Sequence, residues 1–383
     1  METVAPFKEV IEEIKEAGGE AFRFCFQCGL CDTVCPWNRV RQFSIRKIIR
    51  EATFGLTEIE GEDIWRCTTC GRCPERCPRG VKQIEVGVSL RRVASEYEVF
   101  PASVKSARTA RASLISEGNP LQFDRNKRGD WAKDLGVKPF TEDMEALYFV
   151  GCYLSFDPRM KKVATATANI LKKAGVNFGI LGEKESCCGE SIRKTGSEDV
   201  FKTLAKENIK TFVDNGVKKI IVSSPHCYHT FVNEYPEFMV KFEVVHIAQY
   251  IDELIKEGRL KLTGEYSKKV TYHDPCYMGR HNNIYDEPRD VLKGISGLEL
   301  VEMPDSRQDS LCCGGGGGRI WMDTPKEERF SDIRLVQAKD VGAEVLVTAC
   351  PYCITNFEES RLNLEYDEVI EVKDITEIVH EMI

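Results

Sequence analysis

The chain has 383 residues, of which 42% are hydrophobic and 30% charged, a composition typical of a globular protein with more than one domain. Its apolar runs are much shorter than the roughly 18 residues of a membrane-spanning helix. A formal net charge of −8 argues against a nucleic-acid partner. The N-terminus has no basic start followed by an apolar core, so we expect a cytoplasmic location.

Seventeen cysteines are too many for a cytoplasmic protein of this size unless they bind metal or carry out redox chemistry. Eight of them form two runs, "CFQCGLCDTVCP" and "CTTCGRCPERCP", with the spacing C-x2-C-x2-C-x3-C-P. This is the bacterial ferredoxin signature for two cubane [4Fe–4S] clusters, in which the fourth cysteine of each run binds the other cluster. Paired zinc knuckles do not account for this order. We therefore expect one cluster at Cys25, Cys28, Cys31 and Cys77, and the other at Cys67, Cys70, Cys73 and Cys35.

The segments around these runs have helical patterns. Apolar residues recur at helical spacing between the runs and again after the second one: Ile45, Ile48, Ile49, Val81, Ile84 and Val88. Residues 1–100 are therefore predicted to be an all-helical two-cluster ferredoxin module rather than a βαβ ferredoxin. Residues 101–143 are predicted to be a linker or a surface that faces a partner.

The remaining nine cysteines indicate an internal duplication. The first set is Cys152, Cys187, Cys188 and Cys227, and the second is Cys276, Cys312, Cys313, Cys350 and Cys353. Corresponding members of the two sets are 124 to 126 residues apart. We therefore predict two domains in tandem, at residues 144–263 and 264–383.

Short β-rich runs alternate with helical stretches in both halves, which predicts two Rossmann-like α/β domains with parallel sheets. The overall fold class is thus a helical module followed by a tandem α/β pseudo-repeat. The cysteines follow the ends of the predicted strands, where ligands of open α/β sheets bind, so each set is expected to converge. One position breaks the repeat, because "SSPHC" places Ser224 where "TACPYC" has Cys350.

The stretch "DSLCCGGGGGRIW" joins two adjacent cysteines to five glycines, Gly314 to Gly318. Adjacent thiolates do not fit one iron of a regular cube, so they indicate an irregular cluster. Glycines allow the backbone to approach such a cluster and to offer amide hydrogens to its sulfides. A flexible glycine linker explains neither the cysteine pair nor its partners.

The "CCGE" and "CCGGGG" motifs and the closing "CPYC" resemble the D subunit of heterodisulfide reductase and related CCG-domain iron–sulfur oxidoreductases. The resemblance implies that a complete five-cysteine motif holds a noncubane [4Fe–4S] cluster at which a disulfide is cleaved. The ligands would be the five cysteines of the second set. Since Ser224 leaves the first set incomplete, we expect one noncubane cluster and leave metal binding by the first set open.

This resemblance implies an iron–sulfur catalytic subunit that passes electrons through two cubane clusters to the noncubane site, where a disulfide is reduced to thiols. The substrate would be a heterodisulfide, or another protein or small-molecule di- or trisulfide. Because no flavin or nucleotide fingerprint occurs, we expect an electron-donating partner within a hetero-oligomeric complex, either a flavoprotein or a membrane b-type cytochrome. That partner could place the chain at the cytoplasmic face of the membrane. The alternative is an electron-relay subunit without its own substrate, as in class II benzoyl-CoA reductase or in complexes that oxidise glycolate, lactate or glycerol-3-phosphate.

Three histidines lie close to these cysteines in the sequence. His273 in "HDPC" is a candidate proton donor to a departing thiolate, with a bond to the loop backbone as the alternative. His226 and His229 in "SPHCYHTF" could replace the absent thiol, but we predict packed or hydrogen-bonded loop residues.

Overall fold

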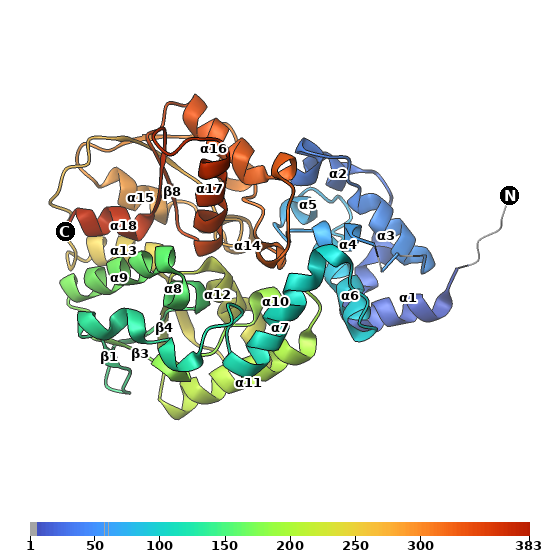
Figure 1. Cartoon of the computed structure of the whole chain (residues 1–383), viewed down its shortest axis with the longest axis horizontal. Helices are drawn as coiled ribbons and strands as arrows, with labels where there is room; N and C mark the ends of the chain where they lie inside the picture. Colours follow the sequence, from blue (N-terminus) through green and yellow to red (C-terminus); the bar gives the residue numbers. More distant parts are fainter. Residues whose placement is uncertain (1–5, 57, 60) are drawn as a thin grey trace.

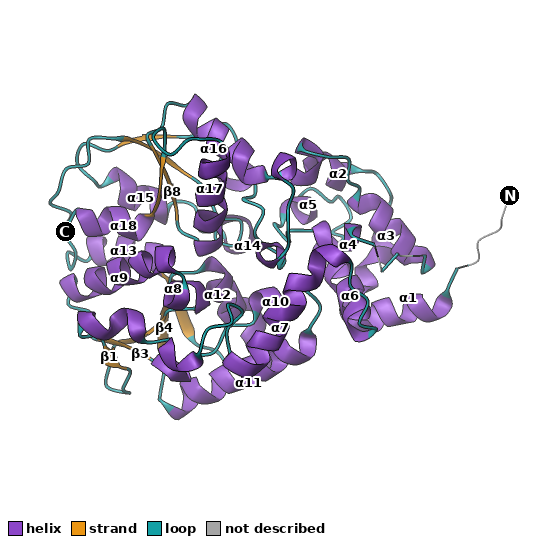
Figure 2. Cartoon of the chain, viewed as in Figure 1, coloured by secondary structure: helices purple, strands orange, loops and turns teal. Residues whose placement is uncertain are grey.

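The computed structural model describes residues 6–56, 58–59 and 61–383. Figure 1 shows a helical N-terminal part, in blue, beside two parts that each contain a sheet, one in green to yellow and one in orange to red. Colouring by secondary structure shows that helices surround both sheets (Figure 2). The described residues include no helix that is long and apolar enough to cross a membrane.

The described residues of the N-terminal part form helices and connecting loops and no strand, as predicted. Its helices are α1 (Lys8–Ile14), α2 (Leu30–Val34), α3 (Ile45–Phe54), α4 (Asp63–Arg66), α5 (Arg72–Glu75) and α6 (Gln83–Glu96). Helix α3 begins where the Ser44 hydroxyl accepts a hydrogen bond from the Lys47 amide, and it buries Ile45, Ile48 and Ile49. The stripe expected from the sequence is therefore confirmed as a core face.

Residues 101–143, predicted to be a linker or a partner-facing surface, contain helix α7 (Lys105–Glu117) and strand β1 (Lys138–Pro139). Helix α7 buries Ala107, Ala110 and Leu114. Strand β1 pairs with β3 (Phe178–Ile180) and forms an edge of the first sheet. The segment is thus part of the packed structure of the first α/β half.

The first sheet has the strand order β1-β3-β2-β4-β5, and every pairing is parallel. Its other strands are β2 (Ala146–Phe149), β4 (Lys219–Val222) and β5 (Glu243–His246). Its helices are α8 (Cys152–Phe156), α9 (Pro158–Lys173), α10 (Glu190–Lys194), α11 (Glu198–Asp214), α12 (Pro225–His229) and α13 (Ile247–Lys256). All four residues of β2 are buried, as expected for a parallel strand covered on both faces.

The second sheet has the order β7-β6-β8-β9 and is also parallel. Its strands are β6 (Lys269–Tyr272), β7 (Glu299–Val301), β8 (Val345–Thr348) and β9 (Glu371–Asp374). Its helices are α14 (Gly279–Asn282), α15 (Glu287–Lys293), α16 (Phe330–Asp340), α17 (Pro351–Asn363) and α18 (Ile375–Glu381). The order matches β3-β2-β4-β5 of the first sheet, so the duplication inferred from the cysteines is visible in the topology.

Short 3-10 or π-helical turns connect these elements. They are η1 (Lys15–Gly19), η2 (Glu20–Phe24), η3 (Pro36–Arg39), η4 (Ala102–Val104), η5 (Arg125–Lys127), η6 (Asp130–Leu135), η7 (Gly182–Lys184), η8 (Thr230–Glu234), η9 (Tyr235–Phe238), η10 (Arg307–Asp309), η11 (Arg319–Trp321) and η12 (Lys326–Glu328).

Candidate functional site

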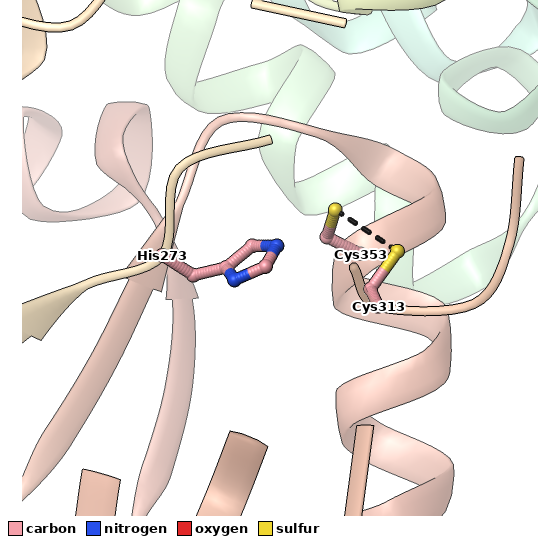
Figure 3. Close-up of side chains that lie close together, drawn as sticks. All are labelled: His273, Cys313 and Cys353. Carbon is pink, nitrogen blue, oxygen red and sulfur yellow. Dashed lines mark hydrogen bonds between the residues drawn. The ribbon is translucent and has the colours of Figure 1, made fainter. Parts of the chain in front are cut away.

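The five cysteines of the second set converge at the carboxyl edge of the second sheet. Cys276 follows β6, and Cys350 and Cys353 lie at the start of α17, directly after β8. The Cys353 and Cys313 sulfur atoms are 3.2 Å apart (Figure 3). Neighbouring thiols also interact between Cys276 and Cys312 and between Cys350 and Cys353. All five are buried and unpaired by disulfides.

These thiols have strongly perturbed acidities. The hydrogen bond with Cys312, followed by burial, raises the pKa of Cys276 well above its usual value. Hydrogen bonds from Cys312 and Cys353 lower the pKa of Cys313. Burial disfavours the Cys350 thiolate, but hydrogen bonds from Cys353 and His226 lower its pKa to about 5. Buried thiolates in contact repel one another unless a cation neutralises them, so the donor set fits a thiolate-ligated iron–sulfur cluster.

The glycine run serves two purposes at this site. The Gly314 amide donates to the Cys312 sulfur over 3.3 Å, and the Gly315 amide donates to Cys313. A β-carbon at Gly316 would lie 2.4 Å from the Thr68 carbonyl oxygen, and one at Gly317 would lie 2.5 Å from that of Cys67. The close approach that glycine makes possible here is to the backbone of the second ferredoxin run.

The two ferredoxin runs face each other through α2 and α5. Burial raises the pKa of Cys35, and the nearby Cys70 and Cys67 thiols raise it further. This cysteine of the first run therefore lies near the second run. That proximity is what the predicted crossed ligation requires. Cys28 is the only exposed cysteine among the seventeen. Three large apolar side chains around it are also exposed: Phe24 (52%), Phe26 (69%) and Leu30 (45%).

The second ferredoxin run directly contacts the five-cysteine site. The thiols of Cys70 and Cys312 interact, and the Cys312 sulfur lies 3.7 Å from the Thr68 hydroxyl oxygen. Arg280, which follows Cys276 in the chain, donates from Nε to the Cys70 carbonyl over 2.7 Å. The two predicted cofactor sites are therefore neighbours.

A buried arginine fastens this contact. The Arg91 guanidinium is fully buried and donates to four backbone carbonyls at 2.7 to 2.9 Å. The acceptors belong to the helical module, to α10 of the first half and to the glycine run: Ile64, Cys67, Lys194 and Gly317. Sequence reasoning missed this residue because its four acceptors are distributed over the whole chain.

The four cysteines of the first set also form a chain of neighbours, in which Cys187 interacts with Cys152 and Cys188, and Cys188 with Cys227. Ser224 lines the same small pocket as these thiols, at the position that has a cysteine in the second half. The buried Arg128 donates from Nη2 to the Cys152 sulfur over 3.4 Å and to Glu185 over 2.7 Å. Sequence reasoning also missed Arg128, because it belongs to the segment assigned as a linker.

His273 lies against the second set of cysteines. One of its ring nitrogens and the Cys313 and Cys353 sulfur atoms lie within 4.8 Å of one another (Figure 3). Arg334 donates from Nε to His273 Nδ1 over 3.1 Å, while Nε2 is buried without a partner among the described residues. Burial, reinforced by Arg334, lowers the pKa of His273 well below its usual value. The ring is therefore neutral, and its proton is on Nε2.

The other two histidines are packed against aromatic rings, but they belong to helix α12 and not to a loop as predicted. His226 lies between Tyr277 and Tyr352, with ring centroids 4.3 and 4.4 Å away. Burial disfavours its charge, but Glu190 at 3.1 Å raises the pKa of His226 to about 10. Burial lowers the pKa of His229 to about 3.

Comparisons with known proteins match both parts of the chain. Residues 146–232 and 270–358 match the CCG family, described as "Cysteine-rich domain", and residues 21–81 match Fer4_8, described as "4Fe-4S dicluster domain". A crystal structure of a hypothetical protein from Helicobacter pylori superimposes with a TM-score of 0.56 at 11% identity, covering 98% of this chain and 76% of that one. At that identity the likeness concerns the fold alone.

Three curated relatives are similar over most of the chain. "Probable iron-sulfur-binding oxidoreductase FadF" of Bacillus subtilis is 38% identical, and "EtfAB:quinone oxidoreductase" of Syntrophomonas wolfei is 36% identical; each match covers 84% of this chain and 46% of the relative. The chain thus spans about half the length of these two proteins. The D subunit of "Dihydromethanophenazine:CoB--CoM heterodisulfide reductase" of Methanosarcina mazei is 32% identical, with 93% of both chains covered.

Proposed function

Because the chain belongs to the family of CCG-domain iron–sulfur oxidoreductases that includes the D subunit of heterodisulfide reductase, we propose that it is the catalytic subunit of a disulfide-reducing complex. The proposal depends above all on one observation. Five buried thiols from three separate segments meet in the second half, in contact with the second ferredoxin run.

Three groups of thiols would hold the cofactors. One cubane cluster takes Cys25, Cys28, Cys31 and Cys77, a second takes Cys67, Cys70, Cys73 and Cys35, and a noncubane cluster takes Cys276, Cys312, Cys313, Cys350 and Cys353. The cubane clusters supply one-electron transfer, and the noncubane cluster supplies the site of disulfide cleavage.

The order of the sites along the protein supports a route for electron transfer. Cys28 is the exposed end of the series, and the apolar side chains around it suit contact with an electron-donating flavoprotein or membrane b-type cytochrome. The Cys70–Cys312 contact is the other end. Arg91 and Arg280 hold the second ferredoxin run against the five-cysteine site by donating hydrogen bonds to the Cys67 and Cys70 carbonyls.

Cleavage of one disulfide bond consumes two electrons and two protons and releases two thiols. The partner supplies the electrons, and protons come ultimately from solvent. The Nε2–H of His273 is positioned to donate a hydrogen bond to a sulfur atom at Cys313 or Cys353. Such a bond stabilises negative charge that develops on that sulfur during cleavage. Because the His273 ring is neutral, it orients and stabilises the sulfur but does not supply the protons of the reaction. Those protons require another donor.

The test uses the full chain with reconstituted clusters, the Cys313→Ala variant and a low-potential viologen as artificial donor. We expect the variant to lose disulfide reduction while the electron paramagnetic resonance signals of the two cubane clusters persist. Undiminished disulfide reduction by the variant would refute the proposal.

An electron relay without its own substrate is the second candidate. It is favoured by the higher identity to FadF and EtfAB:quinone oxidoreductase than to the Methanosarcina protein. In that case the wild-type protein with the viologen donor would reduce no disulfide, although its clusters would accept electrons.

A further inference from the structure

The buried arginines among the described residues fall into two groups. Four of them form ion pairs with carboxylates: Arg66, Arg128, Arg193 and Arg289. The others have no carboxylate of the described residues within 4.0 Å of the guanidinium: Arg91, Arg280, Arg319 and Arg334. A buried guanidinium without a counter-ion is costly, because burial removes water from the charge. The second group therefore needs another source of negative charge.

The unpaired arginines gather at the two predicted cofactor sites. Arg91 and Arg280 donate to carbonyls of the second ferredoxin run. Arg334 donates to the His273 ring at the five-cysteine site. Arg319 directly follows the glycine run and, with Trp37 of the helical module, lines a cavity beside Cys313.

Arg280 lies between the two sites. It belongs to α14, four residues after Cys276, and its Nε donates to the Cys70 carbonyl over 2.7 Å. Its Nη1 donates over 2.7 Å to the carbonyl of Ser310, which precedes Cys312 by two residues, and Nη2 is buried without a partner among the described residues. One guanidinium thus contacts or adjoins the segments that carry Cys70, Cys276 and Cys312.

These three thiols can supply the negative charge that no carboxylate provides. Burial disfavours the guanidinium charge, but the thiolates of Cys70, Cys276 and Cys312 raise the pKa of Arg280 above its usual value. A thiolate-ligated iron–sulfur cluster carries net negative charge, and each electron that it accepts adds to that charge. A cation fixed beside the ligands stabilises the reduced form, which raises the reduction potential.

Arg334 places a similar charge at one site alone. It is fully buried in α16, and its Nε donates to His273 Nδ1 over 3.1 Å. Its other acceptors, the Gln337 side chain and the Ser310 hydroxyl, also belong to the second half. We therefore expect Arg334 to act on the five-cysteine site and not on the second ferredoxin run.

We propose that Arg280 is a positioning residue whose charge raises the reduction potentials of the second cubane cluster and of the five-cysteine cluster together, and that Arg334 raises the latter alone. The inference rests on the proposed function and deepens it, because it assigns the groups that stabilise electrons where the two sites meet. A charge shared by both sites favours the arrival of electrons there without favouring one site over the other.

The test is a redox titration of the full chain with reconstituted clusters, followed by electron paramagnetic resonance. It compares the wild type with Arg280→Gln, which removes the charge, with Arg280→Lys, which keeps it, and with Arg334→Gln. Arg111→Gln, which removes an exposed arginine on α7, is the control. The first cubane cluster is an internal reference in every sample, because the acceptors of Arg280 and Arg334 lie outside the first run.

We expect Arg280→Gln to lower the midpoint potentials of the second cubane cluster and of the five-cysteine cluster by roughly 59 mV or more, which is a tenfold change in the ratio of reduced to oxidised cluster for a one-electron couple. Arg280→Lys should remain close to the wild type, and Arg334→Gln should lower the potential of the five-cysteine cluster alone. The first cubane cluster should keep its potential in all variants, and Arg111→Gln should match the wild type throughout.

Three results would overturn the inference: unchanged potentials in Arg280→Gln at unchanged iron content, a shift of only one of the two clusters in that variant, or an equal shift in Arg280→Lys. If Arg280→Gln does not fold, the other variants decide. A lowered potential of the second cubane cluster in Arg280→Lys or in Arg334→Gln would contradict the inference.

The same samples separate this inference from the proposed function. Disulfide reduction by the wild type, with potentials that Arg280→Gln leaves unchanged, would contradict the inference and leave the proposed function intact. The expected shifts, together with no reduction of any disulfide, would support the inference and contradict the proposed function.

Discussion

Replacing Gly316 by alanine tests the contact between the glycine run and the second ferredoxin run. The new β-carbon would lie 2.4 Å from the Thr68 carbonyl oxygen, about 1 Å closer than an ordinary contact. The Thr68 oxygen belongs to the backbone, so it cannot rotate away from the new β-carbon. Overpacking of this kind costs about 1–3 kcal/mol.

Gly315→Ala is the matched control. Its β-carbon would lie 3.1 Å from the Asn356 side-chain nitrogen and 3.3 Å from the Tyr352 Cβ, contacts that are relieved by shifts of a few tenths of an ångström. Neither glycine has a positive φ, so both variants lose similar backbone freedom in the unfolded chain. The difference between the two therefore isolates the clash with Thr68.

The assay is amide hydrogen exchange of residues 67–70 in the holoprotein under anaerobic conditions. A cost of 1–3 kcal/mol at this contact raises the population of its open state roughly 5- to 150-fold, and amide exchange rises in proportion. Gly315→Ala should exchange at close to the wild-type rate. Equal exchange in the two variants would refute the reasoning that these glycines seat the module against the five-cysteine site.

Three further changes have defined outcomes. His273→Phe removes the Nε2–H beside Cys313 and should make the reduction potential of the second-half cluster more negative at unchanged iron content, measured by redox titration; an unaltered potential would exclude the hydrogen bond. Ser224→Cys completes the first set and should add about four iron atoms per chain, and unchanged iron content would show that this pocket does not assemble such a cluster. Arg128→Met leaves Glu185 buried without its partner and should destabilise the first half by about 3–5 kcal/mol, measured by denaturant unfolding against Arg111→Gln; equal stability of the two variants would contradict this.

The sequence supports the helical module and the duplicated parallel sheets because their signals are spacings that can be counted along the chain. The stripe at Ile45, Ile48 and Ile49 reports one helix face, and the fixed cysteine spacing reports the duplication. Convergence of each cysteine set also follows, since the carboxyl ends of parallel strands share one edge.

The contacts between the parts do not follow from local patterns. Arg91 has acceptors as distant in the chain as Gly317, and Arg280 reaches back to Cys70. The glycine run was expected to approach inorganic sulfide, but its tightest backbone neighbours are Thr68 and Cys67, a proximity that only the assembled fold creates. The cavity beside Cys313 likewise depends on Trp37 and Arg319 meeting across the module boundary.

The central claim is that the five cysteines of the second set hold an iron–sulfur cluster. The most direct test measures the anaerobic iron content and the electron paramagnetic resonance spectrum of the wild type and of Cys313→Ser. The account predicts that the variant contains about four fewer iron atoms per chain and retains both cubane signals. Equal iron content in the two proteins, or zinc in place of iron in the second half, would contradict it.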